Sequence, residues 1–320
     1  MGTVPEMKAG DGLAAILLDK QKQLGPCVFR QGAGLATASD RDLQVNVLLR
    51  LASELDCGAD TACLAVAIVD RMLTDTRVPA KYLHCLALSS LYMALKVCEE
   101  LDSIPGVVQF LIRCRAPYSR TELTRMELAV LQKLRFDLSL PTLHRLVQLA
   151  LTKASVKCSA RLDNDLRPLI GAILTTHRLA CTYSYTELSL ALLTVHWERS
   201  DCAKWWSFKE KRLKKILEVN PVRLAACRLA ILHQLFPEAV NQKENRFLHS
   251  SPDENDRSTP STNKKKAKKR YRILSKSSAG GDAEPKSAKN VENGAKFENA
   301  HNLSDEGYSD ALRVLFGLVN

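Results

Sequence analysis

The chain has 320 residues, 46% of them hydrophobic, and a formal net charge of +11 at pH 7, which leaves room for two domains of ordinary size with polar extensions. No stretch approaches the roughly 18 uninterrupted apolar residues of a membrane span, and the first residues lack the pattern of a signal peptide. We therefore expect a soluble intracellular protein with no membrane partner.

The N-terminal extension, residues 1–38, precedes the densely apolar part of the chain. Its short apolar stretch from Leu13 to Leu18 indicates a short helix. The glycine-rich stretch from Gly25 to Gly34 indicates that a loop follows this helix.

Residues 39–140 predict an all-helical domain, because Leu, Ala, Val and Ile recur there at helical spacing. Five helices are expected, over residues 41–55, 61–73, 80–98, 103–112 and 119–134. Residues that commonly begin helices stand near four of these starts: Ser39 with Asp40, Asp60, Pro79, and Ser119 with Glu122 in a capping box. The third helix is apolar on nearly every face, which places it at the centre of the domain.

Residues 141–240 repeat this plan less regularly, after Pro141 ends the first domain. Five further helices are expected, over residues 142–154, 166–181, 188–197, 204–219 and 221–235. No strand-like alternation competes with the helical spacing in either region. The two regions therefore form a degenerate repeat of five-helix units, and the predicted fold class is all-α.

Residues 241–320 form a polar tail whose composition cannot bury enough apolar surface to fold, so we expect it to be disordered. Seven positive charges lie in the basic run 264–272, and without them the formal charge of +11 falls to +4. We interpret the run as a nuclear import signal, which predicts a protein of the nucleus that is also found in the cytoplasm. Simple solvation of the charges and a phosphate-binding patch are the alternatives. The signal residues are Lys264, Lys265, Lys266, Lys268, Lys269 and Arg270.

Four charged residues lie inside otherwise apolar helical sequence: Arg41, Asp70, Lys96 and Glu127. A charge buried alone costs several kcal/mol, so such residues need partners. Arg41 and Asp70 have opposite charges on consecutive helices, which predicts a structural ion pair. Lys96 and Glu127 have no evident partner within the chain, and both suit the helix dipole at their positions.

Arg41 begins the sequence RDLQVNVLLRL, and Asp70, Lys96 and Glu127 stand in LAVAIVDRML, LSSLYMALKVCEE and RTELTRMELAVLQKL. The pattern resembles the cyclin box, which carries an Arg on its first helix, an Asp-Arg pair late in the second, a Lys at the end of the third and a Glu within Arg-Met-Glu on the fifth. The resemblance is specific over about residues 39–140 and weaker to about residue 240. Through RDLQVNVLLRL, KYLHCLALS and LAAILLDKQKQ the chain is most similar to the atypical cyclin G and cyclin I group.

The resemblance implies two consecutive five-helix cyclin-box domains followed by the disordered basic tail. It also implies a non-catalytic regulatory subunit that binds a cyclin-dependent protein kinase and activates or redirects it. In cyclins the equivalents of Lys96 and Glu127 jointly hydrogen-bond the regulatory helix region of the kinase. We expect exposed apolar residues around them to complete the contact, with Leu101, Ile104, Phe110 and Tyr118 as the candidates.

The first helix departs from the pattern of cell-cycle cyclins. Those proteins carry a substrate-docking patch built from Met, Arg, Leu and Trp, whereas the aligned positions here hold Asp40, Arg41, Gln44 and Val47. Asp and Gln cannot form an apolar groove. Recruitment of Arg-x-Leu substrates through this face is therefore predicted to be absent or weak, which favours an atypical cyclin.

Two alternatives remain within the resemblance. G-type cyclins also associate with regulatory subunits of protein phosphatase 2A, so the chain could act as an adaptor for one. A cyclin-fold nucleic-acid-binding transcription factor of the TFIIB type is the second alternative, but such proteins bring an N-terminal zinc ribbon and this N-terminus has only Cys27.

Aromatic residues interleaved with lysines near residues 197–215 can bind nucleic acid. The spacing also suits a helix with Trp206, Leu213 and Ile216 turned inward and a solvated basic face. We favour this second interpretation, and nucleic acid is not the expected partner. The aromatic residues concerned are Trp197, Trp205, Trp206 and Phe208.

An enzyme is not expected. The sequence contains no glycine-rich phosphate loop, nucleophile elbow or paired carboxylates on a cleft-forming motif, so we predict no catalytic residue and no cofactor. Its ten cysteines are scattered singly, with no CxxC pair and no zinc-type Cys/His spacing, so no metal site is predicted. His144 and His177 lie on helical sequence without ligand spacing, as ordinary core or surface side chains do.

Overall fold

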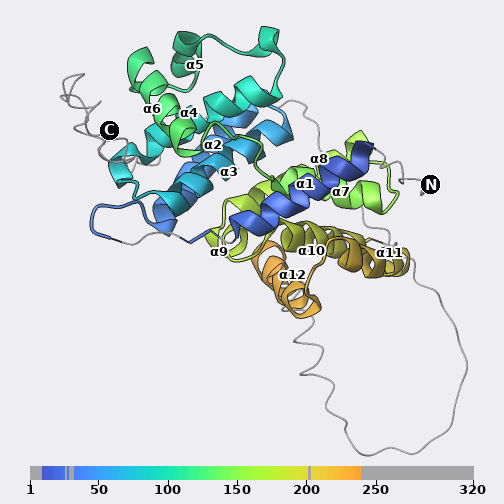
Figure 1. The fold of residues 1–320 in the computed structure, drawn as a ribbon. Coiled ribbons are helices and arrows are strands. Elements are labelled where there is room, and N and C mark those ends of the chain that lie inside the picture. The colour runs from blue at the N-terminus through green and yellow to red at the C-terminus, as the bar shows by residue number, and fades with distance from the viewer. Residues whose placement is uncertain (1–8, 26, 29–31, 201–202, 239–320) are drawn as a thin grey trace, which may run out of the picture.

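The computed structural model describes residues 9–25, 27–28, 32–200 and 203–238. The regular elements in these ranges are helices, apart from an isolated bridge between Leu35 and Pro79 (Figure 1). The predicted all-α fold is therefore confirmed. None of the helices described has the combined length and apolar character of a membrane crossing. The tail predicted to be disordered, residues 241–320 with the basic run, lies outside the described ranges.

The first helical unit is built around α4, the helix whose sequence is apolar on nearly every face. α4 packs against α2, α3 and α6, and its residues from Cys85 to Leu95 are all buried. Its observed span matches the predicted one. The elements up to the end of this unit are α1 (Ala9–Leu24), α2 (Ala38–Glu54), α3 (Ala59–Asp75), α4 (Ala80–Cys98), the 3₁₀ turn η1 (Leu101–Ser103), α5 (Val107–Arg113) and α6 (Arg120–Lys133).

The second unit repeats this arrangement around α10. This helix packs against α7, α11 and α12, and its residues from Glu187 to Val195 are all buried. Ser184 and Glu187 form a capping box at its start. The elements of this unit are α7 (Leu143–Lys153), α8 (Ala160–Leu174), α9 (His177–Ala180), α10 (Tyr185–Glu198), α11 (Ala203–Ile216) and α12 (Pro221–Leu235).

Three predicted helix starts in the first unit were wrong by a few residues. The helix predicted from residue 103 is α5, which begins at Val107 after Gly106, while Ser103 ends the separate turn η1. The other two are the starts of α2 and α3. α2 is capped by Thr37, and Asp40 is the third helical residue, whose carboxylate accepts the Thr37 N–H at 2.9 Å. α3 begins after Gly58, so Asp60 lies in the first turn. In both α2 and α3 the acidic residue stabilises the helix from inside its first turn, where the positive end of the helix dipole favours a carboxylate.

The predicted helix over residues 166–181 was also wrong, because it is two helices. α8 starts earlier, where the Ser159 hydroxyl accepts the Leu162 N–H at 3.2 Å. α9 starts separately because the Asp42 carboxylate of α2 accepts the His177 N–H at 2.8 Å. A residue 135 positions away in sequence thus satisfies the start of a short helix, and no local pattern predicts such a start.

The N-terminal helix α1 is longer than the predicted stretch from Leu13 to Leu18. It contacts α10 and lies across the second unit in Figure 1. Two ion pairs also attach it, from Lys20 to Asp137 at 2.7 Å and from Lys22 to Glu218 at 2.8 Å. Both pairs are largely exposed, and such pairs contribute little to stability.

His144 on α7 joins the two units. Its Nδ1 lies 2.9 Å from Asp60 of α3, and its Nε2 lies 3.1 Å from Asp163 of α8. A ring whose two nitrogens both face carboxylates can donate to both only as the charged imidazolium. Burial lowers the pKa of His144, but the two carboxylates outweigh burial and the pKa is raised.

We expect His144→Gln to destabilise the chain more at about pH 6 than at about pH 8. Because the pKa is raised in the folded chain, the stabilisation is complete below the unfolded value near 6.5 and is lost as the pH rises through the folded value. Urea unfolding of both proteins at the two pH values measures this. Equal destabilisation at both values would show that the charge of His144 contributes nothing.

Candidate partner-binding surface

Arg41 on α2 and Asp70 on α3 form an ion pair inside the first unit. The Arg41 Nε and Nη2 groups donate to the two Asp70 carboxylate oxygens at 2.8 and 2.7 Å. The two side chains are 0% and 2% exposed. Two parallel bonds match the fork of a guanidinium to a carboxylate, so the pair fixes α2 against α3.

The same guanidinium also reaches the second unit. Its Nη1 group donates to the backbone carbonyl of Leu174, at the end of α8, and to Asp42. Burial by itself would lower the pKa of Arg41, but the charge and hydrogen bonds of Asp70 outweigh burial and the pKa is raised. The buried guanidinium therefore stays charged, with its donors satisfied from both units.

Lys96 and Glu127 form a second ion pair, between the last turn of α4 and α6. The Lys96 Nζ lies 2.6 Å from Glu127 Oε1. The expectation that neither residue has a partner within the chain was wrong. α4 and α6 pack directly against each other, and this packing brings the two side chains together.

This second pair differs from the first because it reaches solvent. The Lys96 side chain is 43% exposed, whereas that of Glu127 is 8% exposed. Burial raises the pKa of Glu127, and the Lys96 ammonium offsets this only in part, so the pKa is raised. An ammonium has three donors and a carboxylate accepts several bonds, so both groups keep hydrogen-bonding capacity for a partner.

The four predicted apolar contact residues differ in exposure. Leu101 is 86% exposed, while Ile104 and Tyr118 are partly buried against the core. The prediction that Phe110 is exposed was wrong, because its side chain is 0% exposed and lies 4.8 Å from the Tyr92 ring. α5 is a short amphipathic helix, and Phe110 is on its inner face.

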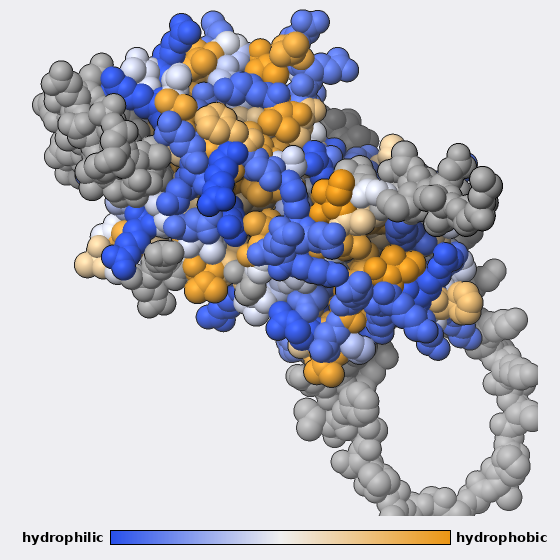
Figure 2. All heavy atoms as spheres, viewed as in Figure 1, coloured by the Kyte–Doolittle hydropathy of each residue, from blue (hydrophilic) through white to orange (hydrophobic). Residues whose placement is uncertain are grey.

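Other exposed apolar side chains near this pair were missed from the sequence. Val97, Val108 and Ile112 are 49%, 54% and 64% exposed. Val108 and Ile112 lie four residues apart on α5, on the face away from Phe110, so helical spacing could have identified them. Figure 2 shows apolar surface at the top of the view, where Figure 1 places α5. We call Lys96, Glu127, Val97, Leu101, Val108 and Ile112 the Lys96 surface.

A hollow of about 330 Å³ adjoins the Lys96 surface, between α5 and the start of α6. It is lined by Val108, Ile112 and Tyr118 together with Arg115 and Arg120. A hollow with apolar walls and a few charged groups can accept an apolar side chain of a partner protein, next to a polar group that pairs with the arginines.

The positions aligned with the substrate-docking patch are occupied by intrachain contacts. Arg41 is buried, Asp40 takes part in the cap of α2, and Gln44 lies 3.0 Å from the Nδ1 of His84. Val47 is partly buried. These positions present bonded polar groups in place of an apolar patch.

The aromatic residues of the second unit mostly pack against one another. Trp206 and Leu213 are buried, as the inward-facing interpretation predicts, whereas Ile216 is only partly buried. The Trp206 Nε1 donates to Thr194 at 3.1 Å. Trp205 and Phe208 remain 45% and 77% exposed on the basic outer face of α11.

Potential metal ligands also meet in one place. Among the described residues, Cys27, Asp70 and Cys181 have ligand atoms that lie within 4.8 Å of one another. The residues of the predicted nuclear import signal, in 264–272, lie outside the described part of the chain.

Comparison with known proteins bears on both the family and the fold. A family model described as the N-terminal domain of cyclin matches residues 15–139. Cyclin-I2 of Homo sapiens is 31% identical over 199 residues, which cover 59% of this chain and 53% of that protein. Cyclin-G1 of Mus musculus is 34% identical over 113 residues, which cover 35% of this chain and 38% of that protein. The match thus spans about half, or less, of these curated relatives.

Among solved structures, the viral cyclin from herpesvirus saimiri is similar with a TM-score of 0.56 at 14% sequence identity. The match covers 71% of this chain and 96% of the viral chain. A likeness at this identity shows the fold alone.

Arg41→Ala is expected to lower the free energy of unfolding by about 3–5 kcal/mol, because it leaves the Asp70 carboxylate buried without its counter-charge. Arg50→Ala, on the same helix, is the control, since Arg50 is 68% exposed and lies 3.7 Å from Glu54. The control should lose less than about 1 kcal/mol. Equal losses in urea unfolding would contradict the structural role of Arg41.

Proposed function

Residues 15–139 form a cyclin N-terminal domain, and from this premise we propose that the chain is an atypical cyclin of the G and I type that binds a cyclin-dependent protein kinase. Cyclins are non-catalytic regulatory subunits, and we propose the same role for this chain. Its action on a kinase is therefore exerted through contact.

The observation that carries this proposal is the Lys96–Glu127 pair at the rim of an apolar surface. The exposed Lys96 ammonium can donate to carbonyl groups of a partner segment, and Glu127 can accept backbone N–H groups from it. Leu101 and Ile112, at 86% and 64% exposed, supply apolar area beside the pair. A few residues supply most of the binding energy of a protein interface, and we propose that Lys96, Glu127 and Leu101 are among them here.

The proposed mechanism is a population shift in the kinase. A rigid surface that binds the active arrangement more tightly than the inactive one moves the equilibrium by the difference in affinity. A shift from about 1:99 to 99:1 needs a difference of about 5.5 kcal/mol. Buried α4 and the buried Phe110 of α5 give the surface the rigidity that this requires.

The α2 face supports an atypical role. Because Asp40 and Gln44 are bonded within the chain, we infer that Arg-x-Leu substrates are not recruited there. Substrate choice would then rest with the kinase or with another surface of the complex.

The double variant Lys96→Ala/Glu127→Ala should reduce capture of a cyclin-dependent kinase by at least about tenfold. A tenfold loss of affinity corresponds to about 1.4 kcal/mol, and removing hydrogen-bonded charges from an interface typically costs more than this. Leu101→Asp, at a site too exposed to disturb the core, should weaken capture as well. Pulldown followed by kinase assay of the eluate measures both.

The matched control is Lys214→Ala/Glu210→Ala, which removes a 2.8 Å pair from α11 and should leave capture unchanged. Circular dichroism verifies the fold of each variant. Unchanged kinase capture by folded Lys96→Ala/Glu127→Ala would contradict the proposal. If the wild-type eluate carries phosphatase activity that the double variant lacks, while kinase activity does not change, the phosphatase 2A adaptor is favoured.

We also propose that the basic run directs the chain to the nucleus. Deleting residues 264–272 should abolish nuclear enrichment of a fluorescent fusion, because import receptors read clustered positive charge. Deleting residues 277–285, a tail segment of equal length without Lys or Arg, should change nothing. Unchanged localisation with weakened DNA binding would instead favour the nucleic-acid alternative.

A further inference from the structure

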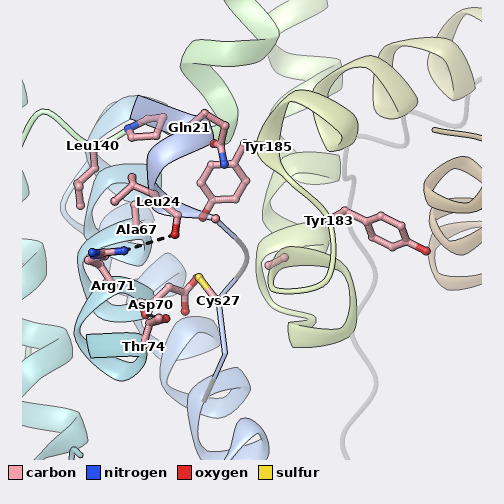
Figure 3. Close-up of a pocket in the computed structure, with 13 residues that line it drawn as sticks. Gln21, Leu24, Cys27, Ala67, Asp70, Arg71, Thr74, Leu140, Tyr183 and Tyr185 are labelled. Atoms are coloured by element: carbon pink, nitrogen blue, oxygen red, sulfur yellow. Dashed lines mark hydrogen bonds between the residues drawn. The ribbon is translucent and has the colours of Figure 1, made fainter. Parts of the chain in front are cut away.

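A cluster of three ligand atoms lies where the N-terminal loop meets both helical units. Cys27 lies in the loop after α1, Asp70 on α3, and Cys181 directly after α9. Two sulfur atoms and a carboxylate oxygen are all within 4.8 Å of one another. Figure 3 shows the Cys27 sulfur beside the Asp70 carboxylate. We propose that this cluster binds one zinc ion.

The geometry is close to that of a zinc site. Zinc bonds of about 2.3 Å to sulfur and about 2.0–2.2 Å to oxygen place the ligand atoms of a tetrahedron roughly 3.5–4 Å apart. The cluster is within 4.8 Å before any metal enters. Rotation of the two cysteine side chains by less than about 1 Å at the sulfur closes the remaining difference.

The donor set selects the metal. Magnesium and calcium prefer oxygen ligands and do not take thiolates, whereas zinc accepts a mixture of thiolate and carboxylate. The charges also balance, because two thiolates and Asp70 carry three negative charges while Arg41 and zinc together carry three positive ones. Binding releases the two thiol protons to solvent.

Asp70 can serve the metal without losing Arg41. Each of its oxygens accepts one Arg41 N–H group, at 2.8 and 2.7 Å. A carboxylate offers about four lone-pair positions, so positions remain for zinc. Arg41 would then orient the ligand, as the outer hydrogen-bonding partners of metal ligands generally do.

A fourth ligand position is available from a small cavity. Cys27 and Asp70 line a cavity of about 50 Å³, with Gln21 and Tyr185 also on its wall (Figure 3). One water needs only about 10–15 Å³ of such space. The cavity therefore supplies room for a water on the zinc ion.

Zinc at this place would fasten the N-terminal loop to both units at once. The helix α1 is also held by its contact with α10 and by the largely exposed ion pairs of Lys20 and Lys22. The three zinc ligands come from residues 27, 70 and 181, and no local sequence motif reveals a site with this spacing. This role is independent of kinase binding and goes beyond the proposed function.

The test uses the full chain, reduced and then loaded with zinc chloride. After gel filtration, metal analysis should find one zinc per chain in the wild type and in Cys158→Ser, the matched control with an exposed thiol. Cys27→Ser should bind zinc at least about 100-fold more weakly, beyond the loss seen for outer partners of metal ligands. Zinc should raise the melting temperature of the wild type and of Cys158→Ser, and leave that of Cys27→Ser unchanged.

Cobalt chloride provides a second readout. Cobalt in the site should give a sulfur-to-cobalt charge-transfer band in the wild type, and this band should be absent in Cys27→Ser and Cys181→Ser. Because Cys27 is only partly buried, Cys27→Ser should fold even where Cys181→Ser does not. A wild type without stoichiometric zinc, zinc retained by Cys27→Ser, or a Cys27–Cys181 disulfide in the reduced preparation would overturn the assignment.

Discussion

The buried Arg41 guanidinium is the point on which the arrangement of both helical units depends. It binds Asp70 of α3 with two hydrogen bonds and the Leu174 carbonyl of α8 with a third. A charge at that depth would cost several kcal/mol without these partners. The next residue, Asp42, accepts the His177 N–H at the start of α9. Two consecutive residues of α2 thus help to fix the second unit on the first, together with His144 of α7, which lies between Asp60 and Asp163.

The two ion pairs of the first unit have the same chemistry and different surroundings. Arg41 and Asp70 are 0% and 2% exposed, so their hydrogen bonds are spent within the chain and hold the fold. Lys96 is 43% exposed and its partner Glu127 is recessed at 8%, so this pair can exchange bonds with another molecule. Because α4 carries Lys96 and is itself packed against α2 and α3, the buried pair positions the exposed one.

The sequence predicted what local interactions decide. The span of α4 and the capping boxes at Ser119 and Ser184 were correct because each depends on neighbouring residues. Features made by packing between distant segments were not predictable in this way. The bond of Lys96 to Glu127 needs α4 to lie on α6, and the inward turn of Phe110 depends on which side of α5 meets the core. A family resemblance identified the charged residues, but only the fold shows which of them face solvent.

Hydrogen–deuterium exchange of the full chain with and without a bound cyclin-dependent kinase tests the central claim most directly. Amide exchange reports which backbone segments a partner covers or stabilises. If the kinase binds the Lys96 surface, exchange should slow in α5 and in the segment after α4, and remain unchanged in α11. Slower exchange confined to the second unit, with α5 unchanged, would contradict the account.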